Sequence, residues 1–146
     1  MPGSLLVSFL LQSKARALRL VLVLTRWWPL SASWYAALHA DFTGPIPDEL
    51  CQLDNLTHLA LHQNALNGTI PSCMGTRLTK LQVLSLANNS LTGQIEPQFS
   101  GLSRLTFLAL WNNHLNGTID AICGLSSLTK LELGNNSLSG YSWLGL

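Results

Sequence analysis

Leucine and asparagine recur along most of the chain in a fixed order and at nearly fixed intervals. The shared frame is Leu-x-x-Leu-x-Leu-x-x-Asn-x-Leu-x-Gly-x-Ile, and its copies begin at Leu56, Leu81, Leu105 and Leu128. Half a frame, residues 42–47, precedes the first copy. Self-similarity at this period is typical of a solenoid, in which each repeat contacts only its neighbours.

The Leu-x-Leu pair inside each frame predicts a short strand. Because strand side chains alternate between faces, both leucines point to one side, which so short a strand cannot bury alone. Parallel stacking of the copies about 4.8 Å apart joins their leucines into one core. The pattern therefore predicts an α/β right-handed solenoid with one short parallel strand per repeat on its concave face and an irregular or 3-10 helical convex side.

An asparagine follows each predicted strand, at the ninth position of the frame. Its amide donates and accepts hydrogen bonds, so it can satisfy backbone groups of neighbouring turns where the chain leaves the strand. A glycine four positions later suits a tight bend. We expect the asparagines to form a buried structural ladder of Asn64, Asn89, Asn113 and Asn136.

The longer consensus ends in Gly-x-Ile-Pro, as in LTHLALHQNALNGTIP (56–71) and FTGPIPDEL (42–50). This form resembles the plant-specific leucine-rich-repeat class, over roughly residues 42–140. The class is known from ectodomains of receptor-like kinases and receptor-like proteins, and from inhibitors of fungal polygalacturonase. The resemblance implies a non-catalytic module that recognises a protein or peptide ligand, with a co-receptor as a further partner, in cell-surface signalling or defence.

Two other functions stay open from the sequence. A secreted protein similar to the polygalacturonase inhibitors would need a charged concave face. A truncated receptor fragment without independent activity is the other alternative, because no polar capping repeat follows Gly140. Enzyme function is not expected, since the kinase signatures of the resembled receptors and any other catalytic constellation are absent from the sequence. No cofactor is expected.

Composition changes near residue 41. Residues 1–40 hold four basic residues and no acid, whereas residues 41–146 hold four basic and seven acidic residues, which gives the net charge of +1. So small a charge does not favour a nucleic-acid partner. We therefore divide the chain into a hydrophobic, basic leader (1–40) and a leucine-rich-repeat domain (41–146).

The leader has three interpretations. Its apolar runs, residues 5–11 and 20–24, flank three basic residues, which makes a membrane span marginal. A signal peptide or membrane anchor, a degenerate leader and an organellar transit peptide all remain open. We expect a helix here, with the tryptophans and tyrosine of residues 27–35 covering the N-terminal end of the solenoid, and membrane association through residues 1–40.

The outward positions of the predicted strands form a candidate binding surface. Phe107 and Trp111 lie four residues apart on one predicted strand, so both rings face the same side. Exposed aromatic side chains on such a surface are typical binding anchors, although an ordinary surface can also carry them. Two histidines occupy the same columns two strands away, and a lysine and a glutamate that can pair follow on the next strand. We predict ligand contact at His58, His62, Phe107, Trp111, Lys130 and Glu132.

No metal site is predicted, because the two histidines have no third ligand at a suitable spacing. The three cysteines are odd in number, and we expect Cys51, Cys73 and Cys123 to pack on the convex side without a disulfide.

Five Asn-x-Ser/Thr sequons lie in the repeat region, and in a secreted protein such sites accept N-linked glycans. Asn67 and Asn116 are the better candidates, because they lie in turns past the predicted strands. Together with the resemblance, the sequons predict an extracellular or plasma-membrane location. The candidate glycosylation sites are Asn55, Asn67, Asn88, Asn116 and Asn135.

Overall fold

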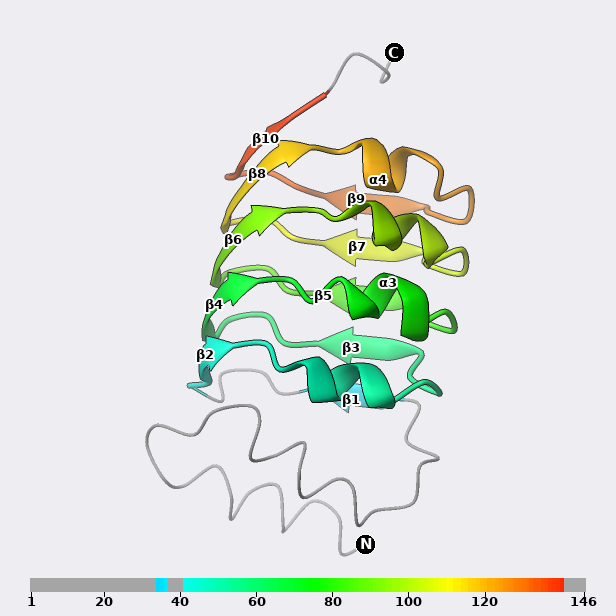
Figure 1. Cartoon of the computed structure of the whole chain (residues 1–146). Coiled ribbons are helices and arrows are strands. Elements are labelled where there is room, and N and C mark those ends of the chain that lie inside the picture. The colour runs from blue at the N-terminus through cyan, green and yellow to red at the C-terminus, as the bar shows by residue number, and fades with distance from the viewer. Residues whose placement is uncertain (1–33, 37–40, 141–146) are drawn as a thin grey trace, which may run out of the picture.

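The computed structural model describes residues 34–36 and 41–140, and the chain in this part winds as a solenoid of stacked turns (Figure 1). Each turn gives one short strand to a first sheet, the concave sheet. Its members are β1 (Trp34–Ala36), β3 (His58–Ala60), β5 (Val83–Ser85), β7 (Phe107–Ala109) and β9 (Lys130–Glu132). These strands are parallel and follow one another in chain order, as predicted.

A second parallel sheet was not predicted. It contains β2 (Thr43–Pro45), β4 (Ala65–Thr69), β6 (Ser90–Gln94), β8 (His114–Thr118) and β10 (Ser137–Ser139). The prediction of one strand per repeat on the concave face is confirmed. The additional strand arises because the Leu-x-Gly-x-Ile end of the frame also has a period of two. Leu66 and Ile70 are both buried, and Asn67 and Thr69 between them are exposed. Gly68 has a φ of 71°, so the predicted bend lies within this strand.

The convex side consists of short helical segments, as predicted. In chain order they are η1 (Asp48–Gln52), α3 (Cys73–Arg77), η2 (Pro97–Gly101) and α4 (Asp120–Cys123). Two are 3-10 helices and two are single α-helical turns. Each returns the chain from the second sheet to the concave sheet, so insertions and deletions of one residue fall here without disturbing the strands.

The leucine core runs through the stack in register. Cα pairing aligns Leu59 with Leu84, Leu84 with Leu108 and Leu108 with Leu131. The first three are fully buried, whereas Leu131 is 38% exposed. The difference has a simple cause: among the described residues no strand lies beyond β9 to cover it.

Asparagine side chains link each turn to the one before it. Asn113, which is 6% exposed, accepts a hydrogen bond at Oδ1 from the Leu91 N–H (3.0 Å). Its Nδ2 donates to the carbonyl oxygens of Leu86 and Leu110, both at 3.0 Å. The same pattern of backbone donors and acceptors recurs at Asn89 and Asn136. Asn64 likewise accepts from the Phe42 N–H of the preceding turn and donates to the Leu61 carbonyl oxygen of its own turn.

β1 lies inside the segment that the sequence assigned to the leader. It pairs with β3 in parallel register, so the concave sheet begins before residue 41. The sequence gives no sign of this strand because residues 34–36 contain no leucine. The remaining leader, with its expected helix and most of its tryptophans, lies outside the described residues. Within the described part, no helix has the length and apolar character needed to cross a bilayer.

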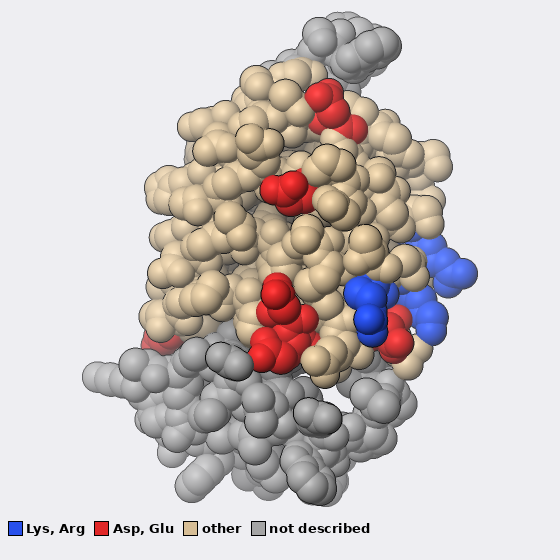
Figure 2. Space-filling model, in the orientation of Figure 1, with Lys and Arg blue, Asp and Glu red and all other residues tan. Residues whose placement is uncertain are grey.

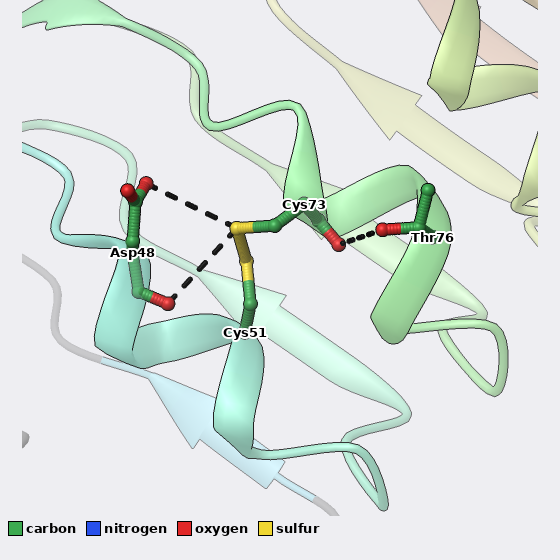
Figure 3. Close-up of a disulfide and its surroundings, with 4 residues drawn as sticks. All are labelled: Asp48, Cys51, Cys73 and Thr76. Atoms are coloured by element: carbon green, nitrogen blue, oxygen red, sulfur yellow. Dashed lines mark hydrogen bonds between the residues drawn. A yellow bond between two sulfur atoms is a disulfide. The ribbon is translucent and has the colours of Figure 1, made fainter.

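A disulfide joins the first two convex segments, contrary to our expectation. Cys51 of η1 bonds to Cys73 of α3, with a Cα–Cα distance of 6.0 Å (Figure 3). Their separation of 22 residues is close to one turn, which places them on neighbouring convex segments. The carbonyl oxygen and Oδ1 of Asp48 both lie 4.0 Å from Cys73 Sγ. A disulfide sulfur has no hydrogen to donate, so these are contacts across the bridge. Cys123 is a free, exposed cysteine.

Removing this bridge should weaken the N-terminal half of the solenoid. We expect Cys51→Ser/Cys73→Ser to lower the free energy of unfolding by about 3 kcal/mol, since a closed loop of this length restricts the unfolded chain. Urea denaturation followed by circular dichroism measures the change, with Cys123→Ser as the matched control. Equal stability of the double variant and the control would show that the bridge contributes nothing to folding.

Candidate functional site

The outward side chains of the concave sheet form two columns that follow the strand register. Val83 pairs with His58 on one side and with Phe107 on the other, and Phe107 pairs with Lys130. The second column, two residues further along each strand, is Ala60, Ser85, Ala109 and Glu132. Ser85 and Ala109 are almost fully buried, at 7% and 2% exposure. Small side chains therefore separate the first column from the residues beyond the strand ends.

Trp111 lies beyond β7 rather than on it, because that strand ends at Ala109. The backbone ladder nevertheless continues past the strand. The Asn88 N–H donates to the Trp111 carbonyl oxygen at 3.0 Å, and the Asn112 N–H donates to that of Gly134 at 2.9 Å. The backbone at Trp111 is therefore held against the neighbouring turns in the same way as the backbone of β7. The Trp111 side chain is 37% exposed.

Lys130 contacts both an acid and an aromatic ring on this surface. Its Nζ lies 2.8 Å from Glu132 Oε1 and 4.9 Å from the centre of the Phe107 ring. Exposed ion pairs stabilise little, and a cation over a ring adds a modest attraction. The main consequence is electrostatic: the two formal charges of the described concave columns neutralise each other.

The two histidines make separate hydrogen bonds to hydroxyl groups. His62 Nδ1 lies 3.0 Å from Ser85 Oγ, and His58 Nδ1 lies 2.9 Å from Thr57 Oγ1. The first of these bonds joins adjacent turns across the concave face. Among the described residues, no three His, Cys, Asp or Glu side chains come together in a way that could hold a metal ion.

The candidate glycosylation sites occupy different surfaces. Asn67 on β4 and Asn116 on β8 are exposed on the second sheet, away from the concave columns. Asn88 has a φ of 53°, and its Oδ1 accepts a hydrogen bond from Asn112 Nδ2 at 2.7 Å. Asn55 Oδ1 accepts from Lys80 Nζ, and Asn135 is exposed beside the ladder.

Most charged side chains lie away from the concave sheet. Figure 2 shows the blue side chains gathered at one edge of the molecule and the red ones spread over the convex side. Three exposed basic residues occur at the end of a convex segment or in the loop that leads to the next concave strand, namely Arg77, Lys80 and Arg104. Lys130 and Glu132 are the two formal charges of the described concave columns, which also carry the partly exposed Phe107, with the exposed Trp111 just beyond its strand.

Comparisons with known proteins agree with this geometry. The family model for the leucine rich repeat matches residues 54–115. Receptor-like protein 6 of Arabidopsis thaliana is 40% identical over 63 residues, which make up 43% of this chain and 6% of that protein. The solved leucine-rich-repeat ectodomain of the Arabidopsis receptor kinase SOBIR1 superposes with a TM-score of 0.69 and 34% identity, over 72% of this chain and 56% of that chain.

A second solved structure includes bound partners. It is the Arabidopsis receptor kinase HAESA in complex with the peptide hormone IDA and the co-receptor SERK1. Its similarity to this chain has a TM-score of 0.66 and 33% identity, over 76% of this chain and 19% of that chain. The matched part of this chain covers 6% of the length of Receptor-like protein 6 and less than two thirds of either solved chain.

Proposed function

We propose that this chain, a leucine-rich-repeat domain of the plant receptor-like type, recognises a peptide or protein ligand on its concave sheet in cell-surface signalling. The observation that carries the proposal is the pair of aromatic side chains, the half-buried Phe107 and the exposed Trp111, on a surface whose charges are neutralised. Such rings supply large contact areas at little entropic cost. A co-receptor is a further partner, by similarity to the HAESA complex.

Four polar side chains complete the proposed contact surface. Those of His58 and His62 lie toward the N-terminal turns, and those of Lys130 and Glu132 lie on the last strand. They offer hydrogen bonds at both ends of the aromatic centre. An uncharged centre with polar margins fits a ligand bound mainly through apolar side chains. It does not favour the alternative of a polygalacturonase-inhibitor-like protein, which needs a charged concave face.

The proposed module is non-catalytic and extracellular. The related leucine-rich-repeat ectodomains support the first point. The Cys51–Cys73 disulfide and the five sequons support the second, because disulfides and N-linked glycans are both typical of secreted chains.

A library of random linear peptides displayed on phage tests the binding surface. We expect peptides selected on the full-length chain to bind Phe107→Ala/Trp111→Ala at least 30-fold more weakly, since a central aromatic anchor contributes about 2 kcal/mol or more. Surface plasmon resonance measures the affinities. Thr79→Ala/Gln98→Ala, at exposed positions outside the concave sheet, is the matched control. Peptides that bind both double variants equally well would contradict the proposed site.

Glycosylation tests the proposed location. When the chain is secreted from plant cells, we expect Asn67→Gln and Asn116→Gln each to remove one step of the mobility shift caused by enzymatic deglycosylation. Both asparagines are exposed on the second sheet, where a glycan leaves the concave face free. Asn112→Gln, an asparagine outside any sequon, should keep the wild-type pattern. A secreted chain whose mobility is unchanged by deglycosylation would overturn this prediction.

A further inference from the structure

We propose that the edge of the solenoid where the chain passes from the convex segments to the concave strands binds a linear acidic polysaccharide with one carboxylate on each sugar. Its cations are Arg77, Lys80 and Arg104, here called the basic edge, and all three are exposed. Blue side chains gather at this edge in Figure 2. The proposal rests on the extracellular location proposed above, but its surface is separate from the concave columns.

The cations of the basic edge follow the stacking of the turns. Lys80 and Arg104 have the same place in two successive loops. In each loop, the N–H directly after the cation donates to a carbonyl oxygen three residues earlier at 2.9 Å. The strands that follow, β5 and β7, pair in parallel register, and adjacent strands lie about 4.8 Å apart. Arg77 lies at the end of α3, three residues before Lys80. The positive charge therefore extends along the solenoid over two turns.

No acid neutralises the basic edge within the described part of the chain. Lys80 Nζ donates to the amide oxygen of Asn55 in the preceding turn, and neither Arg77 nor Arg104 forms an ion pair with a described acid. On the concave sheet, by contrast, the lysine is paired with a glutamate at 2.8 Å. The basic edge thus keeps its charge for an anionic partner, although the repeat domain as a whole has more acids than bases.

Hydroxyl groups lie beside the cations. Exposed Ser103 directly precedes Arg104, and exposed Ser126 has the same place in the next turn. Ser127 Oγ donates to the Ser103 carbonyl oxygen at 2.8 Å, which ties these two loops together. Hydroxyl groups donate to and accept from the hydroxyl groups of sugars. The loops of the basic edge contain no aromatic residue on which nucleic-acid bases could stack. A polymer of carboxylated sugars therefore fits this surface better than a single-stranded nucleic acid.

One acid limits the basic edge on its N-terminal side. Asp54 is exposed in the loop of the preceding turn, directly before Asn55. Its carboxylate repels those of a bound polymer, because like charges disfavour each other at short range. The polymer should consequently lie over the loops of Lys80 and Arg104 and continue toward the hydroxyl groups of the following turn.

Surface plasmon resonance on immobilised polygalacturonate tests the proposal. The full-length chain is produced without glycans, because a glycan on Asn55 would lie beside Lys80. We expect Arg77→Gln/Lys80→Gln/Arg104→Gln to bind about 10-fold more weakly than the wild type, since several exposed ion pairs together contribute modestly. Asp54→Asn should bind about 3-fold more tightly. Wild-type binding should fall as NaCl rises from about 50 to about 200 mM, because salt screens exposed charges.

Three controls define what is recognised. Lys14→Gln/Arg16→Gln/Arg19→Gln removes the same number of charges from the leader and should bind as the wild type does. Fully methyl-esterified polygalacturonate, whose carboxyl groups carry no charge, should not bind detectably. The Phe107→Ala/Trp111→Ala chain should bind polygalacturonate normally, which separates this test from the concave site.

Three results would overturn the proposal. One is equal affinity of the wild type and the triple variant of the basic edge for polygalacturonate. Another is an equal loss of affinity in the leader variant, which would make net charge the only cause. The third is binding to the esterified polymer that is as tight as binding to the acidic one. The substituted side chains of the basic edge are exposed, so an unchanged melting temperature should show that these variants keep the fold.

Discussion

Asn113→Ala should lower the free energy of unfolding by about 3 kcal/mol and the melting temperature by roughly 12–24 °C. The substitution leaves the buried Leu91 N–H without an acceptor and removes two hydrogen bonds to carbonyl oxygens. Those carbonyl oxygens, on Leu86 and Leu110, each keep one ladder donor, so the orphaned N–H is the largest loss. Because each turn contacts only its neighbours, the damage should also loosen the coupling between the two halves of the stack.

Thermal unfolding followed by circular dichroism measures this effect, on protein produced without glycans. Asn116→Ala is the matched control, because Asn116 is an exposed asparagine three residues away and outside the ladder. We expect the control to change stability by less than about 0.5 kcal/mol. Similar melting temperatures for the two variants would show that the ladder does not hold the turns together.

Gly75→Ala should destabilise the chain by about 3 kcal/mol, although alanine is the better helix former by about 1 kcal/mol. Gly75 lies in α3 and packs directly against the backbone of η2. A Cβ built there overlaps the carbonyl group of Gln98 and lies 2.7 Å from the Phe99 nitrogen. These are backbone atoms, which cannot rotate away, so α3 and η2 must separate and expose the buried Phe99 ring.

The matched control for Gly75→Ala is Gly124→Ala. Gly124 follows α4 on the same convex side, has a φ of −85°, and has open space around a built Cβ. We expect this variant to match the wild type or to gain slightly in stability. Urea denaturation of both variants measures their stability. The comparison shows whether the higher helix propensity of alanine or its close contact with η2 determines the effect at Gly75. A more stable Gly75→Ala variant would mean that the convex segments are further apart than described here.

The leucine spacing was sufficient to predict the concave sheet and its columns. A period of two over Leu-x-Leu, repeated at nearly constant intervals, allows one register, because any slip would turn the leucines outward. The position of the asparagine similarly fixes where its amide meets the neighbouring backbone. These features depend only on local periodicity and the repeat length.

Features that depend on contacts between segments were harder to predict. The bridge between Cys51 and Cys73 could have been found from their separation of about one turn. We did not predict the disulfide because an odd number of cysteines argued against a disulfide framework. The sequence of β1 contains no leucine, so the repeat frame does not reveal it. Its pairing with β3 uses backbone hydrogen bonds, which do not require leucine. The exposure of Leu131 depends on what lies beyond the last strand, which a repeat pattern does not contain.

The columns of the candidate site and its Lys130–Glu132 ion pair were predicted, but its other contacts were not. Phe107 and Lys130 share a column by register, and the stacking of the ammonium group over the ring follows from their adjacent strands. The hydrogen bond between His62 and Ser85 joins adjacent turns and has no counterpart in the repeat frame. Ligand contact at these residues remains a prediction.

A crystal structure of the full-length chain bound to a phage-selected peptide tests the central claim most directly. We predict that Leu59, Leu84 and Leu108 lie side by side on parallel strands, with the peptide against Phe107 and Trp111. A peptide bound to the second sheet or the convex segments would contradict the recognition surface. Strands in which these leucines are not neighbours would contradict the solenoid itself.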